Sequence, residues 1–430
     1  MLCAELEGVL DSSRLKSAVS QLGVRYPALS SRIRYTALLR RAFWHIPGDA
    51  PLEDAIEYEH RTMSGGGADA WEPLQRSLDD SVDPSRGRHV RLVCVETGQG
   101  RHRLGLRWIH PFMDLEGGHL LLRELHAVLC GEPPTLGQDP RAIYDRPFGV
   151  KFPESLMRVW QGRFRHDRFS RFRQPRIVEK PDLEHKKCNV VVRTLGARQR
   201  ARFKEQAKRR CIPGPLLYSR ALMVGVARTY SKMAMERGRP REQYVFSLPL
   251  TVPRPGARPG LHGNYITSPW IIFSNRDLKD WTTADAAALC QFKEYHEKSH
   301  DRAMWEMCRA TTRWPLALTR KLVTHRIPRL ATWCTGYRFG NDSTHFGSAR
   351  IVNLWVVGSA KCHPGWIVSW TEFGNSMTIS ATFFEDYLDR QTASDFLDRL
   401  EEEILGSTET IPTEEHGDGC LGEIERRILE

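Results

Sequence analysis

A histidine and an aspartate stand four positions apart at the end of an apolar run in residues 108–122. His110 and Asp114 are followed by Gly117 and Gly118 and then by a leucine-rich stretch. A neutral imidazole is a general base whose pKa lies near working pH. In a chain with 16 His, about one H-x-x-x-D pair is expected by chance, because Asp fills roughly one position in twenty. The elements that surround the pair therefore decide its meaning.

Hydrophobic periodicity predicts a strand that ends at the histidine and a helix that begins at the glycines. The helix spans residues 117–129, and Gly131 is expected to end it. Asp11 is expected to cap an earlier helix that Pro27 ends. Further strands are predicted at residues 1–10, 31–44, 89–96 and 101–109, and residues 62–88, rich in Gly, Ser, Asp and Pro, are predicted to be loop.

A second half begins near Asn189 and repeats the alternation of strands and helices. Strands are predicted at residues 190–192, 244–250, 264–273, 350–357, 365–371 and 377–383. Helices are predicted at residues 196–210, 216–233, 284–307, in the 314–332 region and at 393–405. A chain of 430 residues exceeds the size at which one core stops growing, about 250–300 residues. An α/β class with two layered domains follows.

The composition is that of a soluble globular protein, with 40% hydrophobic and 27% charged residues. No apolar run approaches the roughly 18–20 residues of a membrane span, and the N-terminus lacks the basic start of a secretory signal. The 10 Cys form no C-x-x-C pair, which predicts reduced thiols in a cytoplasmic protein. No Cys/His cluster has zinc spacing, so no metal site is expected.

The net charge of +11 is concentrated in one region. Residues 158–210 contain 18 Lys and Arg against 5 Asp and Glu, which gives this segment +13. An acidic partner would suit it: a phosphorylated cofactor, an acidic carrier protein, an anionic membrane surface or nucleic acid. The alternative is a solvated linker with charged helix faces. No nucleic-acid motif is present, so nucleic acid is not expected.

Aromatic and apolar residues interleave with arginines at the start of this basic region. Leu156, Trp160 and Phe164 alternate with Arg163 and Arg165. If helical, the segment is a basic amphipathic helix suited to peripheral membrane contact. The alternative is a helix whose apolar stripe packs on its own protein.

The order of these elements, with the sequence on them, resembles the chloramphenicol acetyltransferase-like superfamily. That group includes condensation domains of nonribosomal peptide synthetases, polyketide-associated acyltransferases and wax ester synthases. The H-x-x-x-D stretch is similar to their H-x-x-x-D-G motif. The matching phrases lie at residues 6–29, 110–118, 194–230, 247–265, 344–347 and 369–386, so the resemblance spans roughly residues 2–405.

The resemblance implies an α/β fold of two chloramphenicol acetyltransferase-like subdomains in a V-shaped arrangement with a central tunnel. We expect an N-terminal subdomain at residues 1–175 that carries the motif, a C-terminal subdomain at 176–410, and a polar tail at 411–430. A thioester donor would enter the tunnel from one face and an acceptor from the other.

Residue roles also follow from the resemblance. His110 is expected to be the general base, and Asp114 to shape the loop through an arginine. Arg254 is the candidate partner, although the arginine of the family aligns nearer Pro253. A tetrahedral intermediate needs donors for its oxyanion. The "GN" and "SN-G" positions of the family make Asn264, Ser343 and Thr344 the candidates.

Two positions depart from the family pattern. Ile109 stands where many members carry another histidine, and Leu115 stands where a glycine follows the aspartate. A leucine there would narrow the path of the pantetheine arm or reshape the bend. Gly117 and Gly118 would keep the start of the helix small and open, so these three residues are expected along the tunnel.

The predicted function is acyl transfer from a thioester to a hydroxyl or amine, giving an ester or amide. The donor would be an acyl-CoA or an acyl group on a phosphopantetheinyl carrier protein, used as co-substrate, with no tightly bound cofactor. A cytoplasmic monomer is expected. Leu115 leaves a second hypothesis open, that the chain is a non-catalytic condensation-like protein that binds a carrier protein or an acyl chain.

Overall fold

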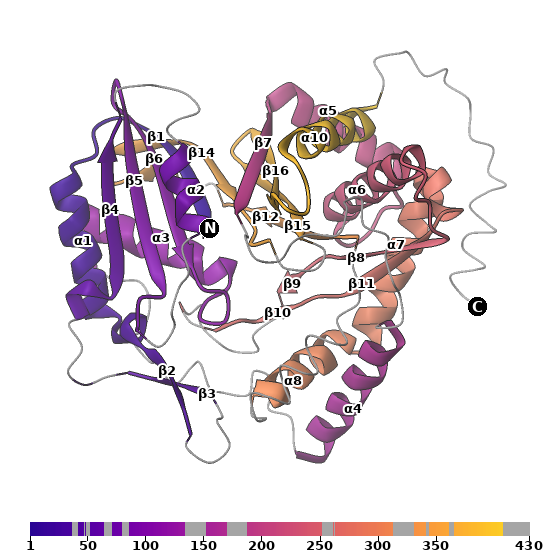
Figure 1. Cartoon of the computed structure of the whole chain (residues 1–430), viewed down its shortest axis with the longest axis horizontal. Coiled ribbons are helices and arrows are strands. Elements are labelled where there is room, and N and C mark those ends of the chain that lie inside the picture. Colours follow the sequence, from indigo (N-terminus) through magenta and orange to yellow (C-terminus); the bar gives the residue numbers. More distant parts are fainter. Residues whose placement is uncertain are drawn as a thin grey trace.

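Two six-stranded sheets lie side by side, each covered by helices (Figure 1). The computed structural model describes residues 1–36, 42–46, 48, 52–63, 71–79, 86–133, 152–169, 187–251, 261, 263–312, 331–340, 344–360 and 365–406. Each half of the molecule has its own hydrophobic core, which includes residues of its sheet and its helices. This is the two-layered α/β organisation that the alternation of strands and helices predicts.

The N-terminal half contains six strands and three helices among its described residues, followed by a long helix that packs on the other half. The strands are β1 (Leu2–Glu7), β2 (Arg32–Tyr35), β3 (Ala42–His45), β4 (Ile56–Thr62), β5 (Val90–Gly98) and β6 (Arg101–Trp108). The helices are α1 (Ser12–Arg25), α2 (Glu72–Asp79), α3 (Leu115–Cys130) and α4 (Phe152–Phe169), with short 3-10 turns at Pro27–Ser30 and Leu52–Asp54.

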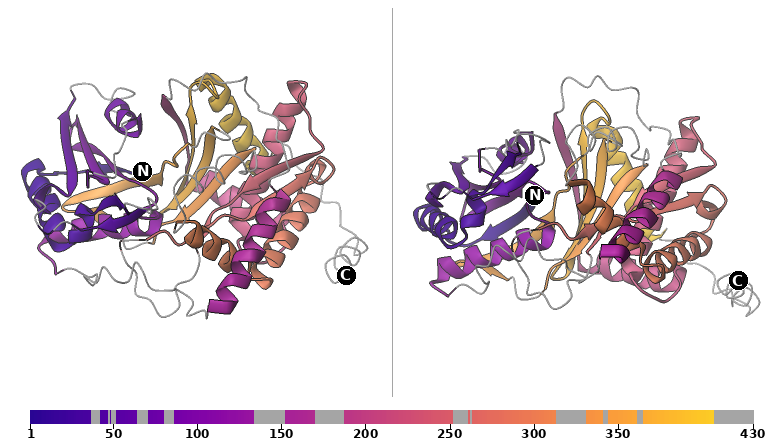
Figure 2. Two further views of the ribbon diagram at one scale, coloured as in Figure 1. Left: turned by 60° about the horizontal axis from the view of Figure 1, so that its bottom comes forward. Right: turned by 90° about the horizontal axis from the view of Figure 1, so that it is seen from below.

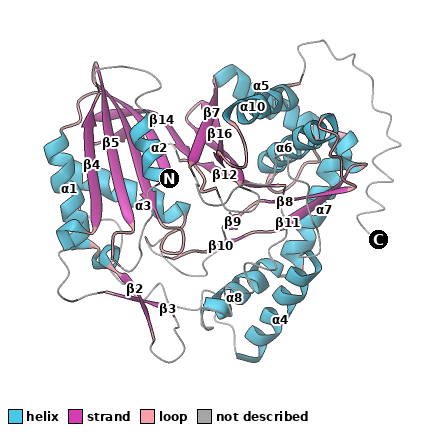
Figure 3. Ribbon diagram, viewed as in Figure 1, coloured by secondary structure: helices cyan, strands magenta, loops and turns pink. Residues whose placement is uncertain are grey.

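The C-terminal half carries the second six-stranded sheet and the helices that pack on it (Figure 3). Its strands are β7 (Cys188–Leu195), β8 (Gln243–Ser247), β9 (Leu250–Thr251), β10 (Ile266–Thr267), β11 (Trp270–Ser274), β12 (Thr332–Arg338), β13 (His345–Phe346), β14 (Ala349–Val356), β15 (Trp366–Phe373) and β16 (Ser376–Phe384). Its helices are α5 (Ala197–Arg210), α6 (Leu217–Glu236), α7 (Trp281–Glu297), α8 (His300–Thr312) and α10 (Arg390–Leu405), with a 3-10 turn at Asp277–Lys279.

The sheet order shows that two strands from the second half of the sequence join the sheet of the N-terminal half. The first sheet runs β13-β14-β1-β6-β5-β4 and the second β11-β8-β12-β15-β16-β7. β14 pairs antiparallel with β1, although more than three hundred residues separate them. A division of the chain into contiguous parts at 175/176 does not account for these two strands, because β13 and β14 complete the sheet of the N-terminal half.

Local signals in the sequence explain most of the elements. Asp11 caps α1 as expected, since its side chain accepts hydrogen bonds from the backbone N–H groups of Ser13 and Arg14. The predicted apolar face of that helix is buried against the first sheet. Gly131 ends α3 in the left-handed conformation, with φ 76°, which glycine adopts without steric cost.

Some sequence predictions are corrected, some strands were missed, and other predictions fall outside the described residues. The 62–88 region is not all loop: α2 forms there, because Leu74 is buried against β5 and β6. The 284–307 helix is two helices, broken where Ser299 takes φ 51°. The strands β4, β12 and β13 had not been predicted. The proposed helix in the 314–332 region and the tail at 411–430 fall almost entirely outside the described residues.

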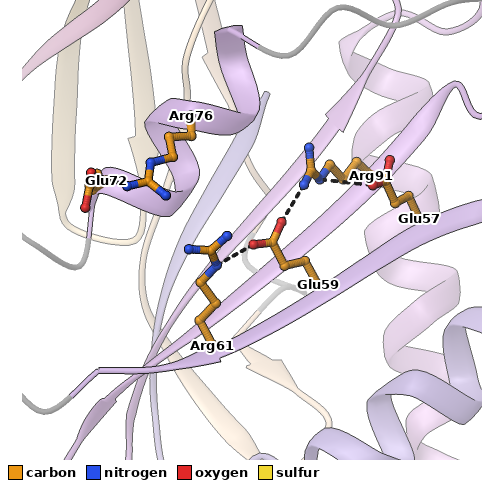
Figure 4. A network of polar contacts seen from close by, with 6 residues as sticks. All are labelled: Glu57, Glu59, Arg61, Glu72, Arg76 and Arg91. Carbon is orange, nitrogen blue, oxygen red and sulfur yellow. Dashed lines mark hydrogen bonds and ion pairs between the residues drawn. The ribbon is translucent and has the colours of Figure 1, made fainter.

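The edge strand β4 carries its charges in a pattern that protects the sheet. It runs parallel to β5, and Glu57, Glu59 and Arg61 follow one another at alternate positions. Glu59 forms ion pairs with both Arg61 and Arg91 (Figure 4). Charged side chains on an exposed edge discourage pairing with another chain, so this network belongs to the sheet and not to the site described below.

Candidate active site

His110 stands immediately beyond the end of β6, in a tight turn. The backbone N–H groups of Phe112 and Met113 both donate to the carbonyl of Ile109, at 3.0 and 3.4 Å. Phe112 and Met113 are buried in the first core, whereas His110 is exposed. The turn therefore anchors its apolar residues and presents the imidazole at the surface.

Asp114 is buried, at 1% exposure, and both carboxylate oxygens accept backbone hydrogen bonds. One oxygen accepts from the N–H of Gly117 at 3.0 Å, which makes Asp114 the N-cap of α3. The other accepts from the N–H of Tyr265, in the other half of the molecule, at 3.2 Å. The carboxylate thus ties the histidine turn to its own helix and to the second half. Its expected partner Arg254 lies outside the described residues.

Backbone hydrogen bonds also join the histidine turn to the second half of the molecule. Gly263 donates from its N–H to the carbonyl of Phe112 at 3.0 Å and accepts at its carbonyl from the N–H of Asp114 at 3.1 Å. Met113 and Gly263 form an isolated parallel bridge. Gly263 has φ +108°, a conformation that side chains disfavour. The segment that leads to β10 therefore docks on the histidine turn through main-chain contacts (Figure 1).

The side chain of Asn264 reaches the ring of His110. Its amide Nδ2 lies 3.4 Å from His110 Nδ1, while its Oδ1 accepts from the N–H of Ile266 at 3.2 Å. The Asn264 carbonyl accepts from the indole of Trp305 on α8 at 3.3 Å. The Trp305 ring also stacks on Tyr265, with an interplanar angle of 7°. Asn264 thus lies beside the imidazole and is itself held by its contacts with Ile266 and Trp305.

The glycines after the aspartate have a packing role. A Cβ at Gly117 would lie 2.4 Å from the carbonyl oxygen of Leu261, and one at Gly118 would lie 2.4 Å from the indole of Trp108. Only glycine admits such close approach. Leu115 is the first residue of α3 and is not among the described residues with positive φ. Leucine there needs none of glycine's conformational freedom, and whether these positions line a tunnel stays a prediction.

Strand pairing places Thr344 far from His110, so the structure does not bring this candidate oxyanion donor to the histidine turn. Its hydroxyl contacts His345, which pairs with Arg350 on β14. Arg350 pairs with Glu7 of β1, and Glu7 with Arg101, the first residue of β6. His110 follows the opposite end of β6, roughly 24 Å away along the strand. An oxyanion donor must lie about 3 Å from the reacting oxygen. Ser343 lies outside the described residues.

The sequence alone did not reveal several residues at this junction. Tyr265 and Trp305 support Asn264, and no local spacing connects them, because α8 follows more than thirty residues later. His119 on α3 contacts the Tyr337 hydroxyl on β12 at 3.1 Å. Burial raises the pKa of Tyr337, and the nearby Glu116 and Asp114 raise it further. This tyrosine is therefore a neutral hydrogen-bonding group between the halves.

One cluster of potential metal ligands lies at the far end of α3. Donor atoms of His126, Cys130 and Glu132 all fall within 4.8 Å of one another. The N–H of Gly347 donates to Nδ1 of His126 at 3.0 Å, however. The neutral ring then carries its proton on the other nitrogen, so neither nitrogen offers an unengaged lone pair to a metal.

Much of the basic character of the C-terminal half is balanced internally. On α5, Arg200 and Lys204 both bind Glu372 of β15. On α6, Arg228 and Lys232 both bind Glu403 of α10. A groove of about 1240 Å³, here called the charged groove, lies beside Glu403. It is lined by Arg202, Arg210, Arg228, Thr229, Lys232, Glu236, Trp281, Asp398, Arg399, Glu401, Glu402, Glu403, Leu405 and Gly406.

Comparison with known proteins identifies the fold. No family model matches the chain, and no curated protein does. Among solved structures, the first condensation domain of the calcium-dependent antibiotic synthetase is similar, with a TM-score of 0.64 at 16% identity over 94% of this chain and 90% of that one. The starter condensation domain of rhizomide synthetase in complex with C8-CoA gives 0.62 at 12% identity, over 96% of this chain and 91% of that one.

The likeness extends to an epimerization domain of tyrocidine synthetase, with a TM-score of 0.57 at 11% identity over 100% of this chain and 93% of that one. At such identities the likeness shows the fold. The chain thus has the chloramphenicol acetyltransferase-like fold of condensation domains, with its two subdomains, as the sequence resemblance implied. Among the described residues, no helix combines the length and apolarity needed to cross a bilayer.

Proposed function

We propose that this protein is a condensation-type acyltransferase in which His110 is the general base. One observation carries the proposal: the turn that presents His110 is fastened to both halves of a condensation-domain fold. Asp114 caps α3 in one half and accepts from Tyr265 in the other, and Asn264 orients the ring. A base held by backbone contacts while its imidazole stays exposed is suited to proton transfer from a bound substrate.

The proposed reaction needs no covalent intermediate on the protein. A hydroxyl or amine attacks the carbonyl carbon of the thioester, and His110 removes its proton as the new bond forms. The tetrahedral intermediate then collapses, the carbon–sulfur bond breaks, and the departing thiolate receives a proton from the imidazolium. Asn264, whose amide lies beside His110, is the remaining described candidate to stabilise the oxyanion.

The donor is proposed to be an acyl-CoA or an acyl-phosphopantetheinyl carrier protein that reaches His110 through a tunnel between the subdomains. The neighbouring starter condensation domain was solved with C8-CoA, which supports a thioester of this kind. We propose that Asp114 acts by holding the turn, since both of its oxygens bind backbone N–H groups. We further propose that the enzyme acts in the cytoplasm as a monomer.

The experiment is a turnover assay with the full chain. The protein is incubated with acyl-CoA and acyl-pantetheine thioesters of several chain lengths and with a panel of amines and alcohols. Thiol release and the mass of the product are measured together. Ester or amide formation above the uncatalysed rate is the expected result. Thioester binding without turnover across the panel would contradict the proposal and favour the non-catalytic condensation-like protein.

A further inference from the structure

The outer face of α4 carries a patch of large apolar side chains. Leu156, Met157 and Trp160 are 54%, 55% and 68% exposed. At 100° per residue they fall within an arc of about 100° on the helix, so they form one stripe. Isolated exposed apolar residues are ordinary, but three neighbours that include a tryptophan mark an interaction surface.

The opposite side of α4 is fixed to the rest of the molecule. Gly162 lets α4 approach α8 so closely that a Cβ would lie 2.7 Å from the carbonyl oxygen of Ala303. Ser155 donates to Glu306 of α8 at 3.2 Å. The two helices lie side by side at one end of the molecule (Figure 2). The patch is therefore a preformed outward surface on a helix that is already packed.

The charge of the surrounding sequence is strongly positive. Residues 158–187 contain 10 Lys and Arg against 4 Asp and Glu, a net charge of +6. Arg158 pairs with Glu154 at 2.7 Å on the same helix. The other basic residues of the segment follow the patch closely in the chain, so an anionic surface is its electrostatic complement.

We propose that the face of α4 formed by Leu156, Met157 and Trp160 binds an anionic lipid surface. The patch offers apolar area and one indole N–H, with no charged or amide side chain among its three members. Such a surface suits a fluid apolar phase, in which tryptophan occupies the headgroup boundary, more than a partner protein with fixed polar groups. This inference is independent of the acyl transfer at His110.

Vesicle flotation with the full chain tests the proposal. We expect the wild-type protein to bind vesicles of mixed phosphatidylglycerol and phosphatidylcholine, and to bind pure phosphatidylcholine vesicles much more weakly. Raising the salt should release it, since mobile ions screen surface charge. The double variant Leu156→Ala/Trp160→Ala should show a partition coefficient at least about tenfold lower, because two large apolar side chains are lost.

Matched control variants test whether the patch on α4, and not exposed apolar side chains in general, is responsible for vesicle binding. Val24→Ala and Met235→Ala remove side chains that are 51% and 50% exposed elsewhere, and they should bind vesicles as the wild type does. Unchanged thermal unfolding shows that each variant is folded. Absence of wild-type binding to anionic vesicles, or undiminished binding by the double variant, would overturn the proposal. So would binding to an acidic carrier protein alone that the double variant loses, since the surface would then dock a protein.

Discussion

The histidine turn and the charged groove both gather polar side chains, but they hold them in opposite ways. In the groove, cations and carboxylates bind each other: Glu403 accepts from Arg228, Lys232 and the indole of Trp281. In the turn, the buried carboxylate of Asp114 binds backbone N–H groups, and the ionisable ring of His110 is exposed. The charges of the groove therefore stabilise the fold, whereas the turn leaves an ionisable ring exposed.

This difference shows what the excess of positive charge means. The sequence alone left open whether the basic segment binds an acidic partner or forms solvated helix faces. On α5, Arg200 and Lys204 form ion pairs with Glu372, and on β7, Arg193 pairs with Asp398. These cations are therefore balanced within the protein. The region that begins in α4 instead combines positive charge with exposed apolar side chains. The helices α4 and α5 are therefore basic for different reasons.

Among changes that leave His110 itself in place, the largest effect should come from crowding the histidine turn. Gly117→Ala places a Cβ 2.4 Å from the Leu261 carbonyl, so the segment that carries Asn264 must move. We expect kcat/KM for acyl transfer to fall roughly a hundredfold, as displacement of a catalytic group by about 1 Å can do, with about 1–3 kcal/mol lost in stability.

Gly196→Ala is the matched control for that variant. Gly196 precedes α5 with φ −70°, and the nearest atom to an added Cβ is a side-chain oxygen at 4.0 Å. Turnover and unfolding close to wild type are expected. Equal losses in the two variants would show that the turn is no more sensitive than an ordinary helix start.

A change in the charged groove should alter stability and leave the chemistry intact. Burial raises the pKa of Glu403, but hydrogen bonds from Lys232 and Arg228 outweigh it, so the pKa lies below its ordinary value. Glu403→Gln should therefore cost about 1–3 kcal/mol of unfolding free energy at neutral pH. Denaturant unfolding measures the loss, and kcat/KM should not change.

The pH dependence of this loss follows from the direction in which the pKa of Glu403 is shifted. A carboxyl with a lowered folded pKa stabilises the fold above its unfolded value of about 4.3, and that stability disappears as the pH falls through the folded pKa. The gap between wild type and Glu403→Gln should narrow in acid. Arg209→Ala, which breaks an exposed pair with Glu205, should change stability by less than about 0.5 kcal/mol at any pH.

The smallest expected effect is a shift in the pH profile of kcat/KM when the neutral amide of Asn264 beside His110 is replaced by a charged group. Asn264→Asp places a carboxylate near Nδ1 of His110, where it stabilises the imidazolium. The acid limb of the kcat/KM profile should move to higher pH, by up to about one unit. Asn264→Ala should lower kcat without moving that limb. An unchanged profile in Asn264→Asp would contradict the contact between the two side chains.

The fold was largely predictable because its signals are local. Caps such as Asp11, the helix end at Gly131 and the buried run of α6 are set by neighbouring residues. α2 was missed because Gly, Ser and Pro surround it, and its helix depends on burying Leu74 against the sheet. β13 and β14 could not be assigned to the first sheet, since pairing across more than three hundred residues leaves no local pattern.

The site was predictable to the extent that it lies within one motif. His110 and Asp114 were proposed from their setting, and Asn264 from its resemblance to a family phrase. The structure brings the three residues together, and their roles stay predictions. Thr344 was chosen in the same way, but the register of β13 and β14 places it at the end of the first sheet opposite to His110. Trp305 and Tyr265 meet only through tertiary packing, which a single sequence does not display.

The most direct measurement compares His110→Ala with His296→Ala in the turnover assay. His296 is 81% exposed at the end of α7, so it controls for loss of a surface imidazole. Loss of general-base catalysis should lower kcat for the His110 variant by roughly 10²–10⁴-fold, with thioester binding and unfolding unchanged, while the His296 variant keeps wild-type kcat. Wild-type turnover by His110→Ala would contradict the assignment of the base.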